Sequence, residues 1–556
     1  MKFRFLKLKT VLAACVFSLA LGQAPRALQA QAVVESKPLL VVSVASADKL
    51  LANLDTLGSI AEAKLLTDMV KGQALKNLNG LDTKRSMGFV VSTSDAGIRK
   101  IGFIPVTDFA ALSKTLNAEP VEGGLARIES KVPIFVKHQN GWAFLSDSPE
   151  DLEKVPADPA ALLAGQEKEY DLAVRGYMAN VPQEMRDLAI EAAKSGVDFA
   201  EQKPGESEED FAIRKQAAKG FISQFVTFLE ETDRVTIGWS VDERAKKAQL
   251  DVNLVAKSGS KLARDLGQLG NAKSKFAGFI LPGAAVTLNV STKSSADQIQ
   301  QARAMLKTGK DRILRSLEED SKISDAQARK TVIEVFNQTW DVLEKTVDEG
   351  IADGAAALVT GPTSLTFVGG MHVADGGKLE AASKKLLEIG KNDPDFPGSL
   401  KLDAESHGEV RMHTIAMPIR DPDAAKVLGE TMDIVIGFGP KAAYLALGKD
   451  AVATLKSAID RSAGETDKVV PPGQLTVALG PILEFVSATS NDPNLGIVLK
   501  VLAGETGKYK GRDRLLVGIR PIENGIGYRI ELEQGLIALA GKAGALLMGA
   551  GAGRGF

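Results

Sequence analysis

Short apolar runs and amphipathic stretches succeed one another along the chain in an order that occurs twice. The clearest instance is Asn140 to Leu152, NGWAFLSDSPEDL, which has a counterpart 300 residues later at Pro440 to Val452, PKAAYLALGKDAV. In both segments a polar turn precedes a short apolar run, which is followed by a polar break and an amphipathic stretch. This order predicts a strand, a turn and a helix in each copy. The repetition predicts a tandem duplication of one domain.

A second match closes each copy. Asp233 to Gly238 (DRVTIG) aligns without gaps with Asp513 to Gly518 (DRLLVG), and at the same offset Gln249 to Asn253 aligns with Arg529 to Glu533. Single apolar residues alternate there with polar ones, which predicts an antiparallel sheet with a buried apolar face and a wet polar face. The matched Asp-Arg pairs predict a turn at the entry of a strand, with the arginine paired to a nearby carboxylate or carbonyl.

Helix starts recur at matching places. Ser46 to Asp48 and Ser295 to Asp297 each follow an apolar run, and Asp108 and Asp375 each follow a predicted hairpin. A short polar side chain before a helix accepts hydrogen bonds from its unpaired N-terminal amides, and an acidic residue favours the positive end of the helix dipole. We therefore expect a helix after each of these four positions.

These patterns predict an α+β protein with two similar tandem domains, each a mainly antiparallel sheet covered by helices, after a cleaved signal peptide. A chain of 556 residues also exceeds the roughly 250–300 at which a single core stops growing. We expect the boundary in the Gly-, Asn- and Lys-rich stretch Gly267 to Lys275. The predicted segments are a signal peptide (1–32), a first repeat (33–268) with a helical insertion (181–231), a second repeat (269–548) with a helical insertion (298–349), and a flexible Gly-rich tail (549–556).

The first 32 residues have the pattern of an export signal. A basic start is followed by the apolar run Val11 to Gly22 and by Ala30 to Ala32, which fits a small-x-small cleavage site. At about twelve residues the run is shorter than the roughly 20 that span a bilayer. Export to the periplasm, cell envelope or extracellular space is the expectation, and lipoprotein processing at Cys15 is the alternative.

The amino-acid composition excludes some kinds of chemistry and disfavours one class of partner. Cys15 is the only cysteine, so the processed chain has no disulfide and no thiol chemistry. Removing the leader takes away five basic and no acidic residues, which changes 68 basic against 70 acidic residues to 63 against 70. This acidic balance disfavours nucleic-acid binding, which needs clustered positive charge.

No catalytic, cofactor-binding or metal-binding residue is predicted. The four histidines are not in a metal-spaced motif; they are His138, His372, His407 and His413. His407 and His413 would stand about 20 Å apart on one strand, and only a tight turn at Gly408 would bring them together. Gly504 to Lys508 and the glycines after Gly549 lack the spacing and context of phosphate-binding loops.

Two further segments leave an alternative open. Trp142 predicts a core or sheet residue, with a ligand platform as the alternative. Gly535 to Gly553 is apolar and rich in Gly and Ala. It predicts a short helix that ends near Leu547 and a frayed tail, with a membrane-interacting tail as the alternative.

The leader, the two α+β copies, the absence of cysteine after processing and the closing D-R-φ-x-φ-G pattern resemble exported bacterial proteins with duplicated domains. The resemblance implies no functional residue. The expected function is a non-catalytic structural or interaction module of the cell envelope. A carrier of a lipid or other apolar ligand is the alternative, and a hydrolase with a dispersed site is the second alternative. The expected partner is an envelope protein or a lipid.

Overall fold

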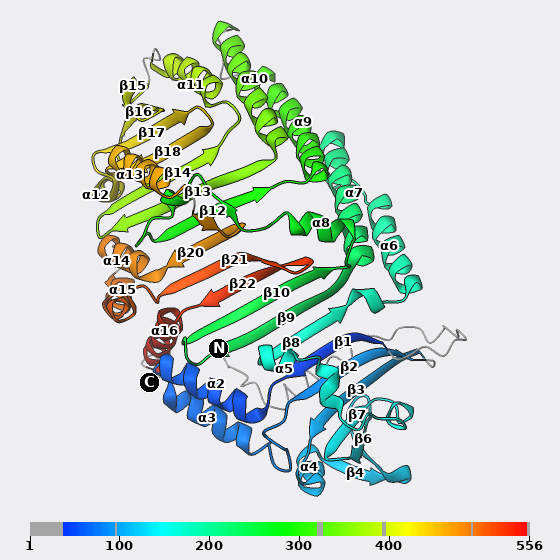
Figure 1. Cartoon of the computed structure of the whole chain (residues 1–556). Coiled ribbons are helices and arrows are strands. Elements are labelled where there is room, and N and C mark those ends of the chain that lie inside the picture. The colour runs from blue at the N-terminus through cyan, green and yellow to red at the C-terminus, as the bar shows by residue number, and fades with distance from the viewer. Residues whose placement is uncertain are drawn as a thin grey trace. The chain divides into compact units, whose positions relative to one another are not determined.

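The computed structural model describes residues 37–94, 97–319, 326–391, 396–466, 468–490 and 493–552. The predicted leader lies outside these residues. Within them the protein is a mixed α/β structure with antiparallel sheet and 15 α-helices (Figure 1). Its residues form two compact units, of which unit 1 comprises Met1–Arg264 with Ile522–Gly527 and unit 2 comprises Asp265–Pro521 with Tyr528–Phe556.

The sheet of unit 1 is antiparallel throughout, in the order β4-β5-β6-β7-β3-β2-β1-β8-β9-β10. Its strands are β1 (Pro38–Val44), β2 (Met87–Ser94), β3 (Gly97–Pro105), β4 (Ala118–Val121), β5 (Leu125–Ile128), β6 (Ile134–Gln139), β7 (Trp142–Ser146), β8 (Leu172–Tyr177), β9 (Thr232–Asp242) and β10 (Lys247–Ala256). Its helices are α2 (Ala47–Ile60), α3 (Lys64–Leu75), α4 (Phe109–Leu116), α5 (Gln166–Glu169), α6 (Gln183–Asp198) and α7 (Glu208–Glu231), and α8 (Lys261–Gly267) lies at the division between the units.

The sheet of unit 2 is also antiparallel, in the order β15-β16-β17-β18-β14-β13-β12-β20-β21. Its strands are β12 (Val286–Lys293), β13 (Ile351–Gly361), β14 (Ser364–His372), β15 (Ser399–His407), β16 (Val410–Pro418), β17 (Thr431–Gly439), β18 (Ala442–Gly448), β20 (Gly473–Ala478) and β21 (Arg514–Ile522), and β22 (Gly525–Leu532) lies beside β21 (Figure 1). A separate two-stranded sheet joins β11 (Ala272–Lys273) to β19 (Val469–Val470).

Helices occupy the connections between the strands of unit 2. They are α9 (Ala296–Glu319), α10 (Ala326–Glu349), α11 (Gly376–Lys391), α12 (Pro422–Leu428), α13 (Ala451–Gly464), α14 (Leu479–Thr489), α15 (Pro493–Thr506) and α16 (Gln534–Ala552). The last of these continues past Leu547, where the glycine content predicts its end. Residues 553–556 of the predicted tail lie outside the described residues.

The two units have the same strand order when their strands are counted from β1 and from β12 and β19, which belongs to the separate two-stranded sheet, is left out. Helix pairs also fall at the same connections: α2 and α3 after the first strand correspond to α9 and α10, and α6 and α7 after the eighth correspond to α14 and α15. The two segments predicted as helical insertions, 181–231 and 298–349, contain α6 with α7 and almost all of α9 with α10.

The capping side chains occupy the predicted places. The Ser46 hydroxyl accepts a hydrogen bond from the Lys49 N–H at 3.3 Å, and the Ser295 hydroxyl accepts one from the Gln298 N–H at 3.3 Å. Asp108 caps α4 through the Ala111 N–H at 3.0 Å. These bonds satisfy amides that a helix leaves unpaired at its N-terminus.

The helix predicted after the apolar run of Asn140 to Leu152 does not form in unit 1, so this prediction is wrong. Unit 2 has the helix α13 after its apolar run, but unit 1 has only the 3₁₀ turns Glu150–Leu152 and Pro159–Leu163 before the four-residue α5. Pro149, Pro156 and Pro159 explain the difference, because proline lacks the N–H that an interior helical position needs.

Each unit has a large apolar core on one face of its sheet, and unit 1 has a second core on the opposite face, beside α4. In unit 1, Phe103, Trp142 and Phe144 pack with Leu152 and Leu163 from the two 3₁₀ turns. Trp142 is therefore a core residue, and its ring lies edge-on to Phe103 at a centroid distance of 5.8 Å.

The core of unit 2 lies at the corresponding place. Val368, Tyr444 and Ala446 pack with Leu455 of α13 and with Phe276 and Phe279, which precede β12. The two matched apolar runs thus each contribute to the core of their own unit.

Candidate binding site

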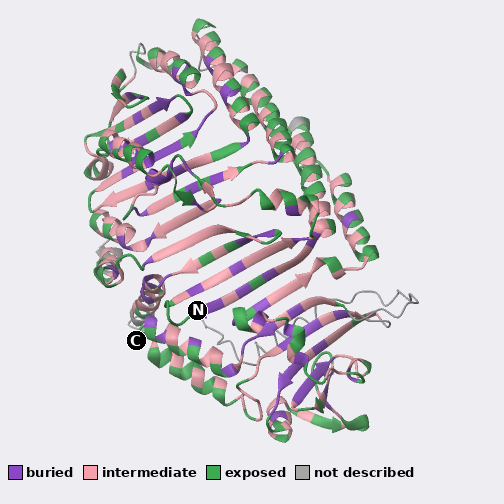
Figure 2. Cartoon of the chain, viewed as in Figure 1, coloured by how far each residue is buried: buried purple, intermediate pink, exposed green. Residues whose placement is uncertain are grey.

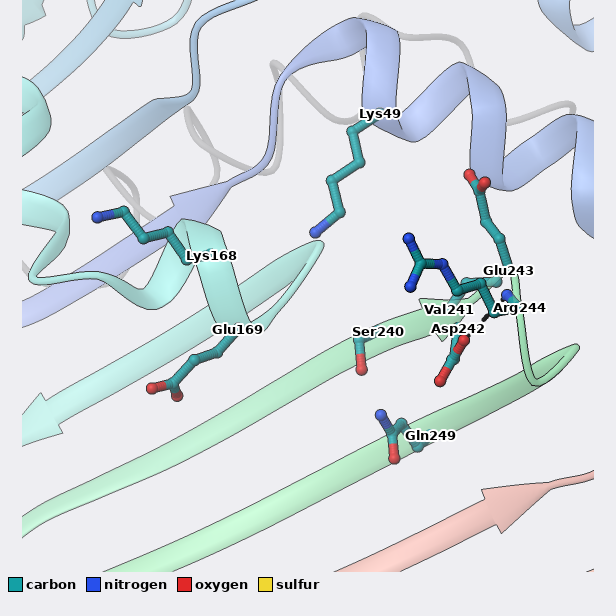
Figure 3. Close-up of a pocket in the computed structure, with 9 residues that line it drawn as sticks. All are labelled: Lys49, Lys168, Glu169, Ser240, Val241, Asp242, Glu243, Arg244 and Gln249. Carbon is teal, nitrogen blue, oxygen red and sulfur yellow. Dashed lines mark hydrogen bonds between the residues drawn. The ribbon is translucent and has the colours of Figure 1, made fainter.

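Unit 1 has an open polar pocket of about 360 Å³ between α2, α5 and the hairpin that joins β9 to β10 (Figure 3). Ser240 and Gln249 lie directly opposite each other on β9 and β10 and line it from the sheet. Lys49 enters it from α2, and Arg244 enters it from the hairpin. The pocket is thus built from three segments that are far apart in the sequence.

A buried carboxylate fixes the position of Lys49. Asp171 precedes β8 and is 2% exposed, and its Oδ1 lies 2.9 Å from Lys49 Nζ. Its Oδ2 accepts a hydrogen bond from the Val241 N–H at 2.7 Å. A lysine ammonium has three N–H donors, so Lys49 keeps donors for a further acceptor.

Unit 2 contains a cluster of charged side chains that sequence analysis did not reveal. Glu380 on α11 is buried and accepts hydrogen bonds from Arg411 Nε at 2.7 and 2.9 Å. Lys384 Nζ lies 3.0 Å from Glu380 and donates to Asp403 at 2.7 Å. His413 is fully buried, and its Nε2 lies 3.4 Å from Glu380 Oε1. The spacing of these residues matches no sequence motif.

A bulge in β15 brings Asp403 into the cluster. The register between β15 and β16 shifts between Lys401 and Glu405, and Asp403 has a left-handed φ of 48°. Its N–H donates to His413 Nδ1 at 3.0 Å. Bulges redirect side chains in this way, and no periodic pattern in the sequence reports them.

Glu380, Asp403 and His413 offer ligand atoms that lie within 4.8 Å of one another. Two features of the geometry oppose a metal ion there. Lys384 already bridges the two carboxylates. The Nδ1 atom of His413 accepts a hydrogen bond, so the neutral ring carries its proton on Nε2 and has no lone pair there for a metal. The cluster is an ion-pair network in which a lysine takes the place of a cation.

The environment shifts the pKa values of this cluster. Burial alone would raise the pKa of Glu380, but hydrogen bonds from Arg411 and Lys384 outweigh it and lower that pKa. The hydrogen bond from Lys384 lowers the pKa of Asp403. Burial, assisted by the positive charge of Lys384, lowers the pKa of His413. The geometry therefore favours charged carboxylates beside a neutral histidine.

The four histidines lie apart from one another. The turn at Gly408 forms, with a φ of 56°, but it pairs His407 with Val410 and not with His413. His407 Nε2 lies 2.6 Å from Asp460, and His372 Nε2 lies 2.6 Å from Glu349. The ring of His138 stacks on Phe109 at a centroid distance of 4.6 Å.

The matched Asp-Arg pairs have structural partners that differ between the units. Arg234 pairs with the neighbouring Asp233, whereas Arg514 donates two hydrogen bonds to Glu533, at 2.9 and 3.1 Å. Asp513 accepts a hydrogen bond from the Gly480 N–H at the start of α14, at 2.6 Å. Gly504 lies within α15, away from any strand-to-helix turn.

Unit 2 exposes part of one face of its sheet, and the exposed part is apolar. Helix α11 covers one end of the same face, where Ile436 pairs with the buried His413. Register places Val517, Leu475, Leu288, Ala356, Gly369, Leu445 and Ile436 in one row across seven strands. A neighbouring row contains Val290 and Met371. The large members Leu288, Val290, Met371 and Leu445 are 38–52% exposed. Figure 2 shows half-buried and exposed positions along these strands. We call the two rows the apolar sheet face.

The corresponding row of unit 1 is Phe89, Val42, Val174, Ile237 and Val252. Ile237 is 47% exposed, whereas Phe89 is 1% exposed, so this row is covered at its β2 end. The predicted orientation of β10 is wrong here. Val252 is only half-buried, whereas Asp251, on the opposite face, is 2% exposed. Tyr170 explains the reversal, because its hydroxyl lies 3.4 Å from Asp251 and accepts a hydrogen bond from Asn253 at 3.0 Å.

Comparisons with protein-family models, curated proteins and solved structures find no match. Among the described residues, no helix combines the length and apolarity that a membrane-spanning segment needs. The fold and its surfaces define a two-unit α+β protein with an exposed apolar row on the sheet of unit 2. These surfaces are the basis for inferring its function.

Replacing Glu380 by Gln should destabilise unit 2. The substitution keeps the shape of the side chain but removes the charge that Arg411 and Lys384 share. We expect urea unfolding at pH 7 to show a loss of about 2 kcal/mol, less than for a fully buried pair because Arg411 is partly exposed. Glu388→Gln, at an exposed position of the same helix, should change stability by less than about 0.5 kcal/mol. Equal effects of the two variants would contradict the network.

The same network sets how stability depends on pH. The folded pKa of His413 lies below its ordinary value of 6.5, so the unfolded chain takes up the proton first and stability falls as pH drops below about 6.5. The folded pKa of Glu380 lies below its ordinary value of 4.5, so its contribution is lost at still lower pH. In Glu380→Gln the second decline should be weaker in urea titrations across pH 3–7.

Proposed function

We propose that the protein is an exported, non-catalytic binding module of the cell envelope whose apolar sheet face receives a partner protein. The single observation that carries this proposal is the row of apolar side chains across seven strands of unit 2. Exposed apolar rows mark interaction sites, since burying a fully exposed aliphatic side chain is worth about 1.5–3 kcal/mol and these side chains are 38–52% exposed. A partner that covers the row recovers this free energy.

The middle of the row supports a protein partner. Ala356 and Gly369 lie between Leu288 and Leu445, and the ring of Phe367 packs over Gly369. The row is thus a continuous apolar surface, which suits the apolar face of a helix or strand of a partner. The charged cluster around Glu380 is assigned a structural role, because its carboxylates already have cationic partners.

A carrier of a lipid or another apolar ligand is the second candidate. The observation that favours it is that the row consists of aliphatic and small residues without a charged member. Acyl chains require such a surface and no fixed hydrogen-bond donors. The two candidates differ in what should be found bound to the purified protein.

Met371→Lys tests the surface directly. A lysine at the centre of an apolar interface costs desolvation of its charge, so the fraction of partner-bound protein should fall at least tenfold, an effect of about 1.4 kcal/mol or more. Met305→Lys on α9 is the matched control, because Met305 is 77% exposed and lies away from the sheet. The measurement is native mass spectrometry of protein purified from its own host envelope.

The outcomes of that experiment separate the candidates. A stoichiometric protein mass that is lost in Met371→Lys and kept in Met305→Lys supports the proposal. A lipid mass with the same dependence favours the carrier. A bound metal or nucleotide, or a partner lost equally in both variants, would overturn the proposal.

Export is part of the proposal and rests on the leader pattern, which ends with Ala30 to Ala32. Cleavage after this site gives a mature chain that begins at Val33. Mass spectrometry of the N-terminal peptide of the purified protein should find Val33 first. An intact Met1 or a lipid-modified Cys15 would contradict cleavage at this site.

We also propose that the two units arose by duplication of one domain. The shared strand order, the helix pairs at the same connections and the DRVTIG and DRLLVG strands support it. In an experimental structure of the mature chain, Asp233 to Gly238 and Asp513 to Gly518 should superpose together with their flanking strands. A different strand order around either segment would refute the duplication.

A further inference from the structure

We propose that the pocket of unit 1 binds a small anion through Lys49, Arg244, Ser240 and Gln249. The ligand group is one with charged oxygen acceptors, a carboxylate or a phosphate. This site is separate from the apolar sheet face, since that face belongs to unit 2 and the pocket to unit 1. Ser240 and Gln249 also lie on the opposite face of their own sheet from Ile237 and Val252. The proposal therefore stands independently of the proposed function.

The groups that line the pocket from the sheet are free to bind. Within the described residues, neither the Ser240 hydroxyl nor the Gln249 side-chain amide has a hydrogen-bond partner. The two residues form one cross-strand pair, so their side chains stand side by side on the same face. A hydroxyl and an amide NH₂ each supply a donor for an anionic oxygen.

Two cations converge above these donors. Figure 3 shows Lys49 and Arg244 pointing toward the same space, from α2 and from the hairpin. Lys49 is held by Asp171, and the Arg244 guanidinium has no hydrogen-bond or ion-pair partner in the part of the chain that the structure describes. Arginine and lysine donors to a carboxylate or phosphate form hydrogen bonds roughly twice as strong as neutral ones.

The acidic residues at the pocket do not occupy this space. The Asp242 carboxylate accepts hydrogen bonds from the Arg244 and Ala245 N–H groups, at 3.0 and 2.9 Å, and so shapes the hairpin. In Figure 3, Glu169 and Glu243 extend away from the space between Lys49 and Arg244. The groups that face that space are therefore hydrogen-bond donors.

The volume of the pocket limits the size of the ligand, and the sequence of unit 2 limits the number of sites. A pocket of about 360 Å³ is near the lower end of ligand sites, which suits a small molecule or the end of a chain. In the aligned segments of unit 2, Arg520 stands at the place of Ser240 and Arg529 at the place of Gln249. The donor set thus belongs to unit 1 alone, and we expect one site per chain.

Isothermal titration calorimetry of the mature full-length protein tests the site with inorganic phosphate and with citrate. At least one of these probes should bind at a stoichiometry of one, and Arg244→Gln should weaken that binding by about tenfold or more. Preference for one probe identifies the anionic group. Because Arg244 is exposed, circular dichroism should show that this variant keeps the fold.

Lys246→Gln is the matched control, since it removes the same charge from the same hairpin at a residue that does not line the pocket. It should leave the dissociation constant within twofold of the unmodified protein. Absence of binding heat for both probes up to 20 mM, or equal weakening by Arg244→Gln and Lys246→Gln, would overturn the proposal. Ser240→Ala gives a second readout, in which a loss of affinity without a change in net charge supports direct contact.

Discussion

The constraint on which the structure depends is that the antiparallel sheet of unit 2 has two apolar faces, one of which the helices of the unit cover only in part. In unit 2, Val368 and Ala446 point into the core beneath α13, while Leu288 and Leu445 point outward from neighbouring positions. The chain provides one packing layer for the centre of this sheet. What the second face contributes to stability therefore depends on what binds to it.

Much of the architecture could be predicted from the sequence. The apolar runs predicted antiparallel strands, and Ser46, Ser295 and Asp108 predicted helix starts that the structure confirms. Which face of a strand is buried could not be predicted, because side chains alternate with a period of two whichever set of residues points into the core. The reversal of Asp251 and Val252 depends on Tyr170, which is about 80 residues away in the chain and carries no local signal.

The candidate sites were less predictable than the fold. Asp403 reaches His413 only because a bulge interrupts β15, and Glu380 reaches them from a separate helix. The pocket likewise combines α2 with the hairpin after β9, so its residues have no common spacing. Residues on one helix or strand can be recognised from their spacing in the sequence. These residues come from different elements and are close only in space.

Charged and polar side chains that already have partners stabilise the fold, whereas those without partners can bind a second molecule. In the Glu380 cluster the carboxylates are matched by Lys384 and Arg411, which makes the cluster a means of fastening α11 to the sheet. Unpaired donors occur in the pocket at Ser240 and Arg244, and unburied apolar area occurs on the sheet. Folding leaves both kinds of interaction unmade in the free chain. They are available to a second molecule, and because the pocket is built from unit 1 and the apolar sheet face from unit 2, the binding of an anion and the binding of an apolar partner involve different side chains.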